Sequence, residues 1–555
     1  MKLKGGDILV ETLLEQGVDT IFGYPGGQII DVYDSLWTYR DKMKHVLTAH
    51  EQGAAHAADG YARSTGKVGV VFATSGPGAT NLVTGIATAY LDSVPMLAIT
   101  GNVPTRQIGT DSFQEIDITG ITLPITKHNY FVNRIEDLAD TIREAYQLAM
   151  SGRPGPVLVD IPKDVQQATC SFKAKSAVEK TPINEPDITL VNEAAKLIKH
   201  AKRPFIYFGG GMISSGAQKE MLELADKIDA PIGCSLMGIS GLPDGTPRFL
   251  GFQGMHGHYA SSLAMHHADL VISLGVRFND RTTGNRAKFA PTADFIHIDV
   301  DPSELSKTVP CVCGIRGDLK GTLRRLNKAV EPKENLDWNA FIARQIGIEK
   351  QNEDMRDGMT PKNVLKTLDK IKGKDTPVCT DVGQHQMWAA QHLTFEHPRQ
   401  FLTSGGLGTM GFGLGASIGC ALGTGKHTVL VTGDGSFGMC LNELTTAVTN
   451  KIPVVILIMN NGVLGMVRQW QTLFFDQHYS NTIIDRKTDF VALAKAFGAD
   501  GEAVDNLNDL RGALEKAFKV QGPYVINATI NKDEMVLPML PPGGSVDDII
   551  VKLGD

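Results

Sequence analysis

The sequence predicts an α/β protein built from three doubly wound parallel-sheet domains. Two observations lead to this prediction. Short aliphatic and β-branched runs alternate with helical patterns almost throughout the 555 residues. Many of the 59 glycines follow these runs, as they do in α/β proteins whose strand-to-helix loops approach ligands closely. Continuous apolar runs separated by helices indicate parallel sheets that are buried on both faces.

The strongest strand candidates are seven apolar runs, at residues 68–73, 96–100, 156–161, 205–209, 270–275, 427–433 and 454–459. Two polar, charged and proline-bearing stretches, 171–188 and 331–361, interrupt the alternation, as connections between domains do. We therefore expect domains at 1–170, 189–330 and 362–530. The prolines of the tail, 531–555, preclude a regular helix there, and we expect the tail to pack across a surface.

Composition excludes several classes of protein. Hydrophobic residues make up 42% and charged residues 21% of the chain, with a net charge of -7, which favours neither nucleic acid nor a membrane surface as a partner. The seven cysteines form no CxxC pair, so neither a zinc ribbon nor a disulfide framework is indicated. The opening residues read as an amphipathic helix rather than a signal peptide. These features are typical of a cytoplasmic protein with reduced thiols.

The stretch GDGSFG, at 433–438, matches the G-x-G-x-x-G spacing of a dinucleotide-binding loop, but Asp434 would face the pyrophosphate. The next strand ends at Asn460 and Asn461, where a nicotinamide or flavin fold needs Asp or Glu. A lone GDG is often only a turn. However, Asp434 and Asn461 both follow strands of one βαβ unit, and their oxygens suit Mg²⁺. A cation between Asp434 and a diphosphate would remove the repulsion. No P-loop motif is present.

The GDG motif followed by Asn-Asn, with Asp434 and Asn461 27 residues apart, resembles the cofactor-binding signature of the thiamin-diphosphate-dependent enzymes. HEQGAAHAADGYARSTG, which begins at His50, and TSGPGATN, at 74–81, resemble the pyrimidine-binding domain of the same superfamily. The resemblance implies that Glu51 exchanges a proton with N1′ of the cofactor. A glutamate at a helix start is also favoured by the helix dipole alone. His50 and His56 belong to no HExxH motif and are not expected to bind metal.

Across essentially the whole chain, the sequence resembles the catalytic large subunit of acetohydroxyacid synthase, also called acetolactate synthase. The motifs that carry this resemblance are FGYPGG (22–27), IGTDSFQE (108–115), GPVLVDIPKDV (155–165), RFNDR (277–281), LGTMGFGLGAS (407–417), LGMVRQWQ (464–471) and LPMLPPGGSVD (537–547). The resemblance implies the three-domain fold of thiamin-diphosphate enzymes. It also implies decarboxylation of pyruvate and condensation of the hydroxyethyl unit with a second 2-keto acid. Pyruvate would give 2-acetolactate and 2-ketobutyrate would give 2-aceto-2-hydroxybutyrate, at the first common step of branched-chain amino acid biosynthesis.

Site residues follow from the same resemblance. Mg²⁺ would be held by Asp434, Asn461 and the backbone carbonyl of Val463. The other residues implied to bind thiamin diphosphate are Gly383, Gln384, His385, Gly408, Met410, Gly435, Ser436, Gly465 and Met466, the last propping the cofactor in its bent conformation. The residues implied around the reacting carbon are Gly27, Phe113, Gln114 and Lys163. Those implied to select the second substrate are Trp470, Arg277 and Met255.

The middle domain resembles the flavin-binding domain of the family. The residues implied to hold FAD are Arg153, Gly209, Gly210, Gly211, Ser235, Leu236, His256, Gly275, Arg277, Asp299 and Asp318. Because the two ends of the thiamin cofactor would contact different domains, which in this family come from two subunits, we expect a homodimer or homotetramer with shared active sites, and a small regulatory subunit. The chain departs from the usual family pattern at Gln28, Ala49 and Asn279, the last of which replaces an aspartate and bears on flavin affinity.

Three alternatives remain open at this stage. A flavin-free catabolic acetolactate synthase would lack flavin absorbance. A flavoenzyme of the pyruvate oxidase type would consume oxygen with pyruvate. The third is a catalytically inactive binding or assembly subunit on the same fold, against which the retention of Glu51, Asp434 and Asn461 argues.

Overall fold

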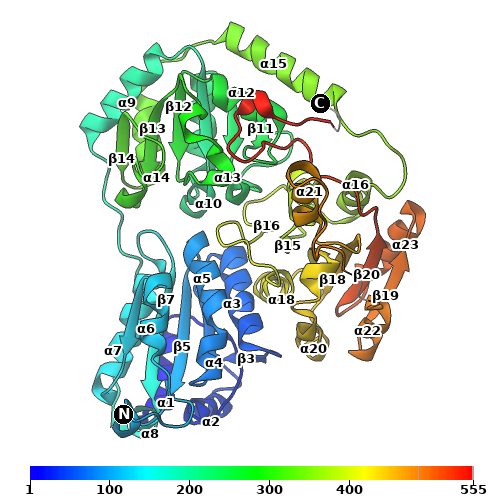
Figure 1. Ribbon diagram of the computed structural model, residues 1–555. Helices are drawn as coiled ribbons and strands as arrows, with labels where there is room; N and C mark the ends of the chain where they lie inside the picture. Colours follow the sequence, from blue (N-terminus) through cyan, green and yellow to red (C-terminus); the bar gives the residue numbers. More distant parts are fainter. Residues whose placement is uncertain (485–486, 553–555) are drawn as a thin grey trace. The chain divides into compact units, whose positions relative to one another are not determined.

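The computed structural model describes residues 1–484 and 487–552. The chain divides into two compact units. Unit 1 comprises Met1–Thr181, Thr376–Gln386 and Leu402–Lys532, and unit 2 comprises Pro182–Asp375, Met387–Phe401 and Asp533–Asp555. Three six-stranded sheets account for most of the strands (Figure 1). The three parallel-sheet domains expected from the sequence are therefore confirmed, whereas their exact boundaries stay a prediction.

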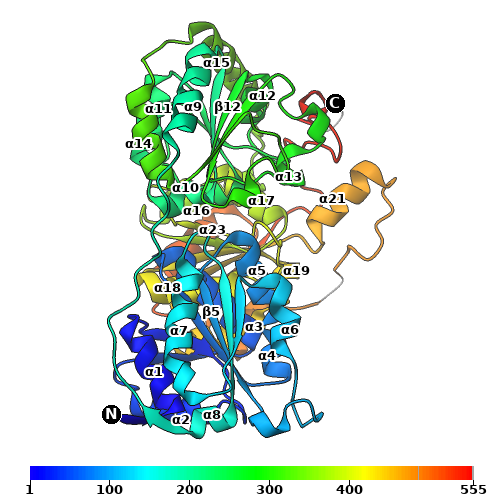
Figure 2. The same ribbon diagram turned by 90° about the vertical axis from the view of Figure 1, so that its left-hand side faces the viewer.

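The first sheet lies in unit 1 in the order β3-β2-β4-β5-β7-β6, and every neighbouring pair is parallel. Its strands are β2 (Thr20–Gly23), β3 (Lys44–Leu47), β4 (Gly69–Ala73), β5 (Met96–Asn102), β6 (His128–Phe131) and β7 (Pro156–Pro162). The helices of this domain are α1 (Gly5–Glu15), α2 (Ile30–Thr38), α3 (Glu51–Thr65), α4 (Pro77–Asn81), α5 (Val83–Asp92), α6 (Ile118–Thr122), α7 (Ile135–Met150) and α8 (Lys163–Gln167). Figure 2 shows α1 and α7 on one side of β5 and α3 on the other.

Alternation along the buried strands assigns each side chain to one of these two faces. Val70 and Phe72 of β4 join the core under α1, α2 and α7. Val71 and Ala73 of the same strand join the core under α3 and α5. Since both faces are covered, the strand reads as a continuous apolar run.

The third sheet, also centred in unit 1, has the order β16-β15-β17-β18-β20-β19. Its strands are β15 (Val378–Thr380), β16 (Phe401–Leu402), β17 (Thr428–Gly433), β18 (Val454–Asn460), β19 (Asp500–Val504) and β20 (Tyr524–Thr529). The accompanying helices are α17 (Gln384–His392), α18 (Gly413–Thr424), α19 (Asp434–Phe437), α20 (Leu444–Thr449), α21 (Gly465–Phe474), α22 (Phe490–Ala496) and α23 (Leu507–Ala517). Numbered within their own domains, the first and third sheets share the strand order 2-1-3-4-6-5.

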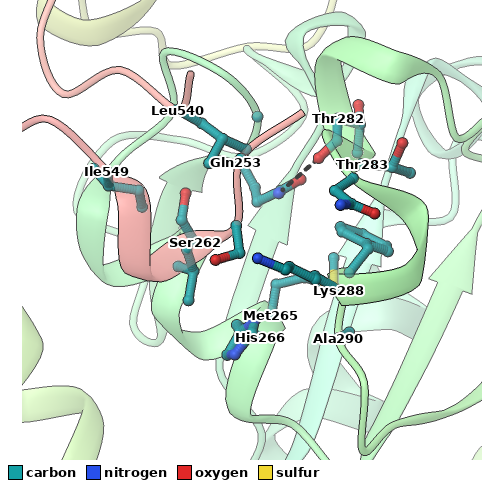
Figure 3. A pocket seen from close by; sticks show the side chains of 16 residues that line it. Gln253, Ser262, Met265, His266, Thr282, Thr283, Lys288, Ala290, Leu540 and Ile549 are labelled. Carbon is teal, nitrogen blue, oxygen red and sulfur yellow. Dashed lines mark hydrogen bonds between the residues drawn. The ribbon is translucent and has the colours of Figure 1, made fainter. Parts of the chain in front are cut away.

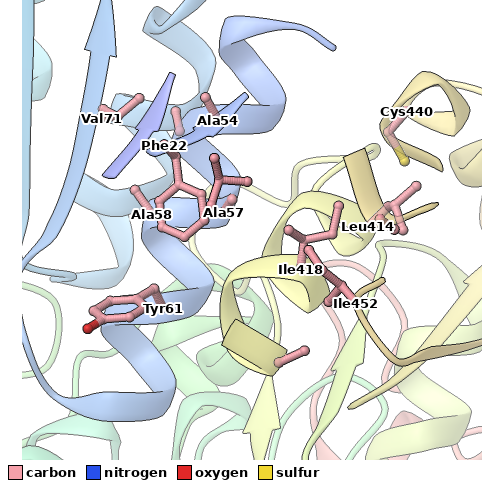
Figure 4. Close-up of a cluster of buried hydrophobic side chains, with 14 of the residues drawn as sticks. Phe22, Ala54, Ala57, Ala58, Tyr61, Val71, Leu414, Ile418, Cys440 and Ile452 are labelled. Carbon is pink, nitrogen blue, oxygen red and sulfur yellow. The ribbon is translucent and has the colours of Figure 1, made fainter. Parts of the chain in front are cut away.

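Helices α3 and α18 join these two sheets through small residues. A Cβ on Gly60 would overlap the carbonyl of Ala416, and one on Gly419 would overlap the carbonyl of Ala57. Apolar side chains beside this crossing form one core that extends from Val71 of β4 to Ile456 of β18. Figure 4 shows Leu414 and Ile418 of α18 and the alanines of α3 within it. The first and third sheets are thus packed as one body by backbone-to-backbone contact.

The middle sheet forms the centre of unit 2, with all pairs parallel in the order β11-β10-β9-β12-β13-β14. Its strands are β9 (Pro204–Phe208), β10 (Ile232–Cys234), β11 (Phe249–Phe252), β12 (Leu270–Leu274), β13 (Asp294–Asp299) and β14 (Cys313–Arg316). Its helices are α9 (Ile188–His200), α10 (Gly210–Ser215), α11 (Gln218–Lys227), α12 (Tyr259–His267), α13 (Asp280–Thr283), α14 (Leu319–Ala329), α15 (Leu336–Gln351) and α16 (Pro361–Ile371). Within the domain this order is 3-2-1-4-5-6, the arrangement found in dinucleotide-binding folds.

Two local expectations need correction. The polar stretch 331–361 contains the helix α15, whose Trp338 is 3% exposed and donates from Nε1 to the carbonyl of Pro204 at 3.0 Å. The helix was not predicted because only a few of its side chains are buried and most of its surface is polar. At the amino end, Lys2–Lys4 form strand β1, which pairs antiparallel with β8 (Thr169–Ser171) before α1 begins. In the described part of the chain, no helix combines the length and hydropathy needed to cross a bilayer.

Candidate functional site: three clusters at the carboxyl ends of the sheets

The residues around GDGSFG lie where open α/β sheets bind ligands. In the third sheet, successive connections leave β15 and β17 in opposite directions, so a crevice opens between their carboxyl ends. Gly383, Gln384 and His385 follow β15, and Asp434 and Ser436 follow β17. The Ser436 hydroxyl donates to the carbonyl of Val382 at 2.9 Å, which joins the two loops. The predicted diphosphate-binding residues therefore meet at one crevice.

Asp434 is 7% exposed, and burial raises the pKa of its carboxyl to about 6, opposed by the backbone N–H groups of Gly435, Asn461 and Gly462. No cation pairs with it among the residues that the structure describes. A buried carboxylate in this situation is stabilised by a bound cation. No cluster of three or more histidine, cysteine, aspartate or glutamate side chains suited to a metal occurs within 1–484 and 487–552. The predicted set, one carboxylate, one amide and one carbonyl, fits a hard cation that keeps some of its water.

A chain of amides holds Asn461 in place. Its Nδ2 donates to Oε1 of Gln384 at 3.3 Å, and its Oδ1 accepts from the N–H of Val463 at 3.2 Å. Gln384 in turn donates to Oε1 of Gln469 at 3.0 Å. A Cβ on Gly465 would overlap Oε1 of Gln384. Gly465 is therefore required where helix α21 begins beside the amide chain.

His385 forms one wall of the same crevice in its neutral form, because burial lowers its pKa to about 3. Its ring fills the space where side chains on Gly383 and Gly433 would lie. Gly408 has φ +68° and an exposed backbone. Met410 and Met466 are partly buried. The cluster thus combines open glycine backbone with apolar sulfur-containing side chains.

A second cluster lies on the first sheet. Glu51 is the first residue of α3 and is 9% exposed, and Nδ2 of Asn81 donates to its Oε2 at 2.9 Å. The Lys163 ammonium, at the start of α8, donates to the carbonyl of Gly27 at 2.8 Å. Apart from the two chain neighbours of Gly27, no described residue has an atom within 4 Å of the position that a Cβ on Gly27 would take. The carboxyl ends of β2, β3 and β7 bring these groups to one edge.

The loop 108–115 adds Phe113 and Gln114 to this edge. Phe113 is 83% exposed, and Gln114 adopts φ +62° against Gly76. The carboxylate of Glu115 accepts from the N–H groups of Gly109 and Ser112 and closes the loop. An exposed phenyl ring on a closed loop is suited to cover a substrate.

The residues predicted to select the second substrate fall in both units. Trp470 lies half-buried on α21 of unit 1, in edge contact with Phe474 at 6.0 Å between ring centroids. Arg277 lies half-buried after β12 of unit 2. Met255, also in unit 2, accepts from the N–H of Leu540 through its carbonyl at 2.7 Å. The tail, as expected, packs across a surface.

The third cluster lies at the carboxyl ends of β9 and β12, between which the connections of the middle sheet reverse direction. The N–H of Gly211 donates to the carbonyl of Gly275 at 3.0 Å, and Gly275 has φ +52°. Side chains at Gly209 or Gly211 would strike Gly275, so the glycines permit close approach of backbone. Gly210 begins α10 after β9, and Ser235 and Leu236 follow β10 at the start of a short 3-10 helix. This crevice is of the kind that receives dinucleotides.

Other predicted flavin residues have local structural partners as well. Asp299 accepts from the N–H of Asp301 at 2.9 Å, and Asp318 caps α14 by accepting from Gly321 at 2.6 Å. Burial lowers the pKa of His256 to about 4. Arg153 lies in unit 1, where its Nε donates to the hydroxyl of Ser93 at 2.8 Å. Asn279 caps the short helix α13 by accepting from Thr282 at 3.0 Å, a role that aspartate fills equally well.

A small pocket of about 30 Å³ lies between α12, α13 and the tail (Figure 3). Gln253 and Thr282 line it from the middle domain, and Leu540 and Ile549 line it from the tail. It has room for a water molecule or two but not for a flavin ring. At this pocket the tail packs against α12 and α13 of unit 2.

Three family models match successive parts of the chain. They describe a thiamine pyrophosphate enzyme N-terminal TPP binding domain at residues 3–121, a central domain at 191–326 and a C-terminal TPP binding domain at 381–528. The large subunit of acetolactate synthase isozyme 2 from Escherichia coli is 43% identical over 553 residues, which cover 99% of this chain and 100% of the relative. The chain belongs to the acetolactate synthase large subunits. The Corynebacterium glutamicum large subunit is also 43% identical, over 100% of this chain and 91% of its own length. A probable large subunit from Methanocaldococcus jannaschii is 43% identical over 99% of this chain and 95% of its own length.

Several side chains that contact predicted site residues, or the loops and turn that carry them, were not predicted from the sequence. They are Asn81, Asp92, Glu115, Glu443 and Gln469. Asn81 ends the TSGPGATN motif, Glu115 ends IGTDSFQE and Gln469 lies within LGMVRQWQ, so the motifs themselves could have indicated these three. The carboxylates of Asp92 and Glu443 bind backbone more than 300 residues away in sequence, and no local pattern could have indicated them.

Proposed function

We propose that this chain is the catalytic subunit of an acetolactate synthase. It converts two molecules of pyruvate into 2-acetolactate and carbon dioxide, and pyruvate with 2-ketobutyrate into 2-aceto-2-hydroxybutyrate and carbon dioxide. The observation that carries the proposal is the similarity over the full length of the chain to large subunits of this enzyme. The reaction is the first common step of branched-chain amino acid biosynthesis.

Bound thiamin diphosphate supplies a nucleophilic carbon and an electron sink, which allow pyruvate to lose carbon dioxide and its remaining two-carbon unit to join a second keto acid. Glu51 exchanges a proton at N1′ of the aminopyrimidine. Because Asn81 donates to Oε2, the other carboxylate oxygen of Glu51 is left for that exchange. Asp434, Asn461 and the carbonyl of Val463 would hold Mg²⁺ beside the diphosphate, with Gly383, Gln384, His385, Gly408, Met410, Gly435, Ser436, Gly465 and Met466 around it.

The other side chains act on the keto acids. Lys163 attracts the carboxylate of the incoming pyruvate, and Phe113 excludes water from the reacting carbon together with Gln114 and Gly27. Trp470 offers an indole face to the ethyl group of 2-ketobutyrate, and Met255 adds an apolar contact. Arg277 pairs with the carboxylate of the acceptor.

We propose FAD as a further resident group. The residues proposed to hold it are Gly209, Gly210, Gly211, Ser235, Leu236, His256, Gly275, Arg277, Asp299 and Asp318 of unit 2, and Arg153 of unit 1. The close-approach glycines and the strand order support this, and Asn279 caps helix α13. The overall reaction is neither an oxidation nor a reduction, so the flavin undergoes no net change. Flavin absorbance of the purified protein, and its loss in a Gly211→Val variant, tests this assignment.

The assembly we propose is a homodimer or homotetramer with shared active sites, joined by a small regulatory subunit and working in the cytoplasm. The description of the relatives as large subunits supports the small partner. Sedimentation of the purified chain, alone and with a candidate small subunit, measures both associations.

The decisive assay supplies pyruvate, Mg²⁺, FAD and thiamin diphosphate, with and without 2-ketobutyrate, and measures both hydroxy acid products. Glu51→Gln should abolish product formation, whereas Glu136→Gln, on an exposed helix start, should not. Full activity of Glu51→Gln would refute the proposed role of Glu51. Oxygen consumption in place of acetolactate formation would instead assign an oxidase.

A further inference from the structure

The side chain of Glu443 links the third sheet's domain to the turn that precedes Glu51. Its Oε2 accepts from the N–H of Ala49 at 3.1 Å, and its Oε1 accepts from the N–H of His50 at 3.0 Å. These two N–H groups stand directly before the first residue of α3. The two oxygens of Glu443 therefore hold the two backbone N–H groups immediately before Glu51, as a two-point clamp.

Further contacts hold this carboxylate in place. The Thr446 hydroxyl, one turn later on α20, donates to Oε2 at 2.6 Å, and Thr446 is fully buried. Glu443 itself is 1% exposed. A Cβ on Gly53 would overlap Oε1 of Glu443, so only glycine at this position lets α3 approach the carboxylate.

Charge also favours the arrangement. The carboxylate faces the amino end of α3, where the helix dipole stabilises negative charge. Burial raises the pKa of Glu443, and the Thr446 hydroxyl, the two N–H groups and the nearby His50 side chain oppose that rise. Burying a carboxylate costs free energy, and the helix dipole alone does not explain why both oxygens of Glu443 are also held by hydrogen bonds.

We propose that Glu443 is a positioning residue for Glu51. By binding the N–H groups of Ala49 and His50, it fixes the backbone at the start of helix α3 and thereby the orientation of the Glu51 side chain. The inference rests on the proposed function, in which Glu51 exchanges a proton with the thiamin cofactor. Glu443 does not itself touch the reacting atoms. Its effect is on geometry, and a misplacement of about 1 Å in a catalytic group lowers turnover on the order of 10²-fold.

The test compares Glu443→Gln with the parent protein in two measurements. Hydrogen exchange of the cofactor-free protein, followed by mass spectrometry of peptides spanning 45–55, reports on the clamped N–H groups without any catalysis. Steady-state kinetics with pyruvate reports on Glu51. We expect faster exchange confined to this segment, a fall in kcat on the order of 10²-fold, and little change in the KM for pyruvate.

Two further variants separate positioning from folding. Thr446→Val keeps the volume but removes the donor to Oε2, and should show the same changes more weakly. Asp489→Asn is the matched control, because Asp489 also accepts from two backbone N–H groups, those of Val491 and Ala492, away from Glu51. It should leave kcat and the exchange of 45–55 unchanged.

The outcomes distinguish this inference from the proposed function. If Glu51→Gln abolishes activity while Glu443→Gln keeps the parent kcat and exchange, Glu443 is not a positioning residue. If Glu443→Gln loses kcat only in proportion to a loss of folded protein, with exchange raised throughout unit 1, its role is structural and the inference is wrong. If Glu51→Gln remains active, the proposed function fails first.

Discussion

The carboxylate of Asp92 accepts a hydrogen bond from Nη2 of Arg63 at 2.9 Å, and neither side chain is more than 9% exposed. The same carboxylate accepts from the N–H groups of Gly405 and Gly406 at 3.0 and 2.7 Å. Arg63 also donates to the carbonyl of Thr403 at 2.9 Å and pairs with Asp59. A buried ion pair of the first domain thus holds the loop that leads to Gly408 and Met410.

Asp92→Asn should therefore lower both stability and cofactor affinity. Leaving a buried charge without a partner costs about 3–5 kcal/mol. Because Arg63 keeps Asp59 as a partner, we expect a loss below that range, and the freed loop would bind thiamin diphosphate more weakly. Thermal unfolding and calorimetric titration with thiamin diphosphate measure the two effects. Asp41→Asn, at an exposed position, is the control. An unchanged dissociation constant in Asp92→Asn would show that the clamp does not position the loop for the cofactor.

Gly465→Ala tests the amide chain around Asn461. The added methyl group would overlap Oε1 of Gln384 and displace the partner of Asn461. We expect the Mg²⁺ concentration for half-maximal activity to rise at least about tenfold, which corresponds to a loss of about 1.4 kcal/mol. Gly512→Ala is the control, because a Cβ there meets no atom within 4 Å. A normal requirement for Mg²⁺ in Gly465→Ala would show that the contact between Gln384 and Asn461 does not position Asn461 for the metal.

Asp160 makes the stability of the fold depend on pH. It is 2% exposed, and burial raises the pKa of its carboxyl to about 6, opposed by donors from Thr100 and Asn102 at 2.6 Å each. Between pH 4 and 6 the unfolded chain loses this proton while the folded chain keeps it, so stability falls as pH rises through this window. A pKa raised by about 2 units in the folded state corresponds to a loss of roughly 3 kcal/mol in the free energy of unfolding across this window.

Asp160→Asn should remove that part of the slope. Its thermal midpoint, measured from pH 4 to 7, should fall less with rising pH than the midpoint of the parent protein. Asp381 and Asp434 have pKa values shifted in the same direction, so part of the slope remains in the variant. Parallel curves for variant and parent would mean that Asp160 is ionised in the folded protein at pH 5.

Trp470→Leu should change the choice of acceptor. The indole is proposed to contact the ethyl group of 2-ketobutyrate, and one methylene contact is worth about 1–3 kcal/mol. The preference for 2-ketobutyrate over pyruvate should fall about tenfold in a competition assay, while acetolactate formation from pyruvate alone persists. Phe474→Leu, which removes the ring beside Trp470, should have a smaller effect. An unaltered product ratio in Trp470→Leu would reject this role.

The strands and the loops that follow them could be predicted because buried parallel strands leave a direct mark on composition. The runs at 68–73 and 427–433 correspond to β4 (Gly69–Ala73) and β17 (Thr428–Gly433). Once β17 and β18 are adjacent and parallel, geometry alone brings Asp434 and Asn461 to one edge. Helix α15 could not be predicted in this way, because its polar surface dominates the composition of residues 331–361.

Contacts between domains left no such mark. The Glu443 clamp on Ala49 and His50 depends on how α3 crosses α18, and residues 394 positions apart carry no shared periodicity. The family resemblance identified groups expected to touch ligands, such as Glu51. It did not identify Glu443 or Asp92, whose carboxylates bind backbone N–H groups and neighbouring side chains of the protein itself.

The crossing of α3 and α18 has a consequence for how this enzyme can diversify. Where Gly60 meets Ala416 and Gly419 meets Ala57, main chain rests on main chain, so no rotamer can shift to absorb a replacement. Substitutions at Gly60 and Gly419 are therefore expected to be poorly tolerated. We expect new substrate preferences to arise instead outside this junction, in the loop 108–115 and around Trp470, where a replacement displaces no backbone of the α3–α18 crossing.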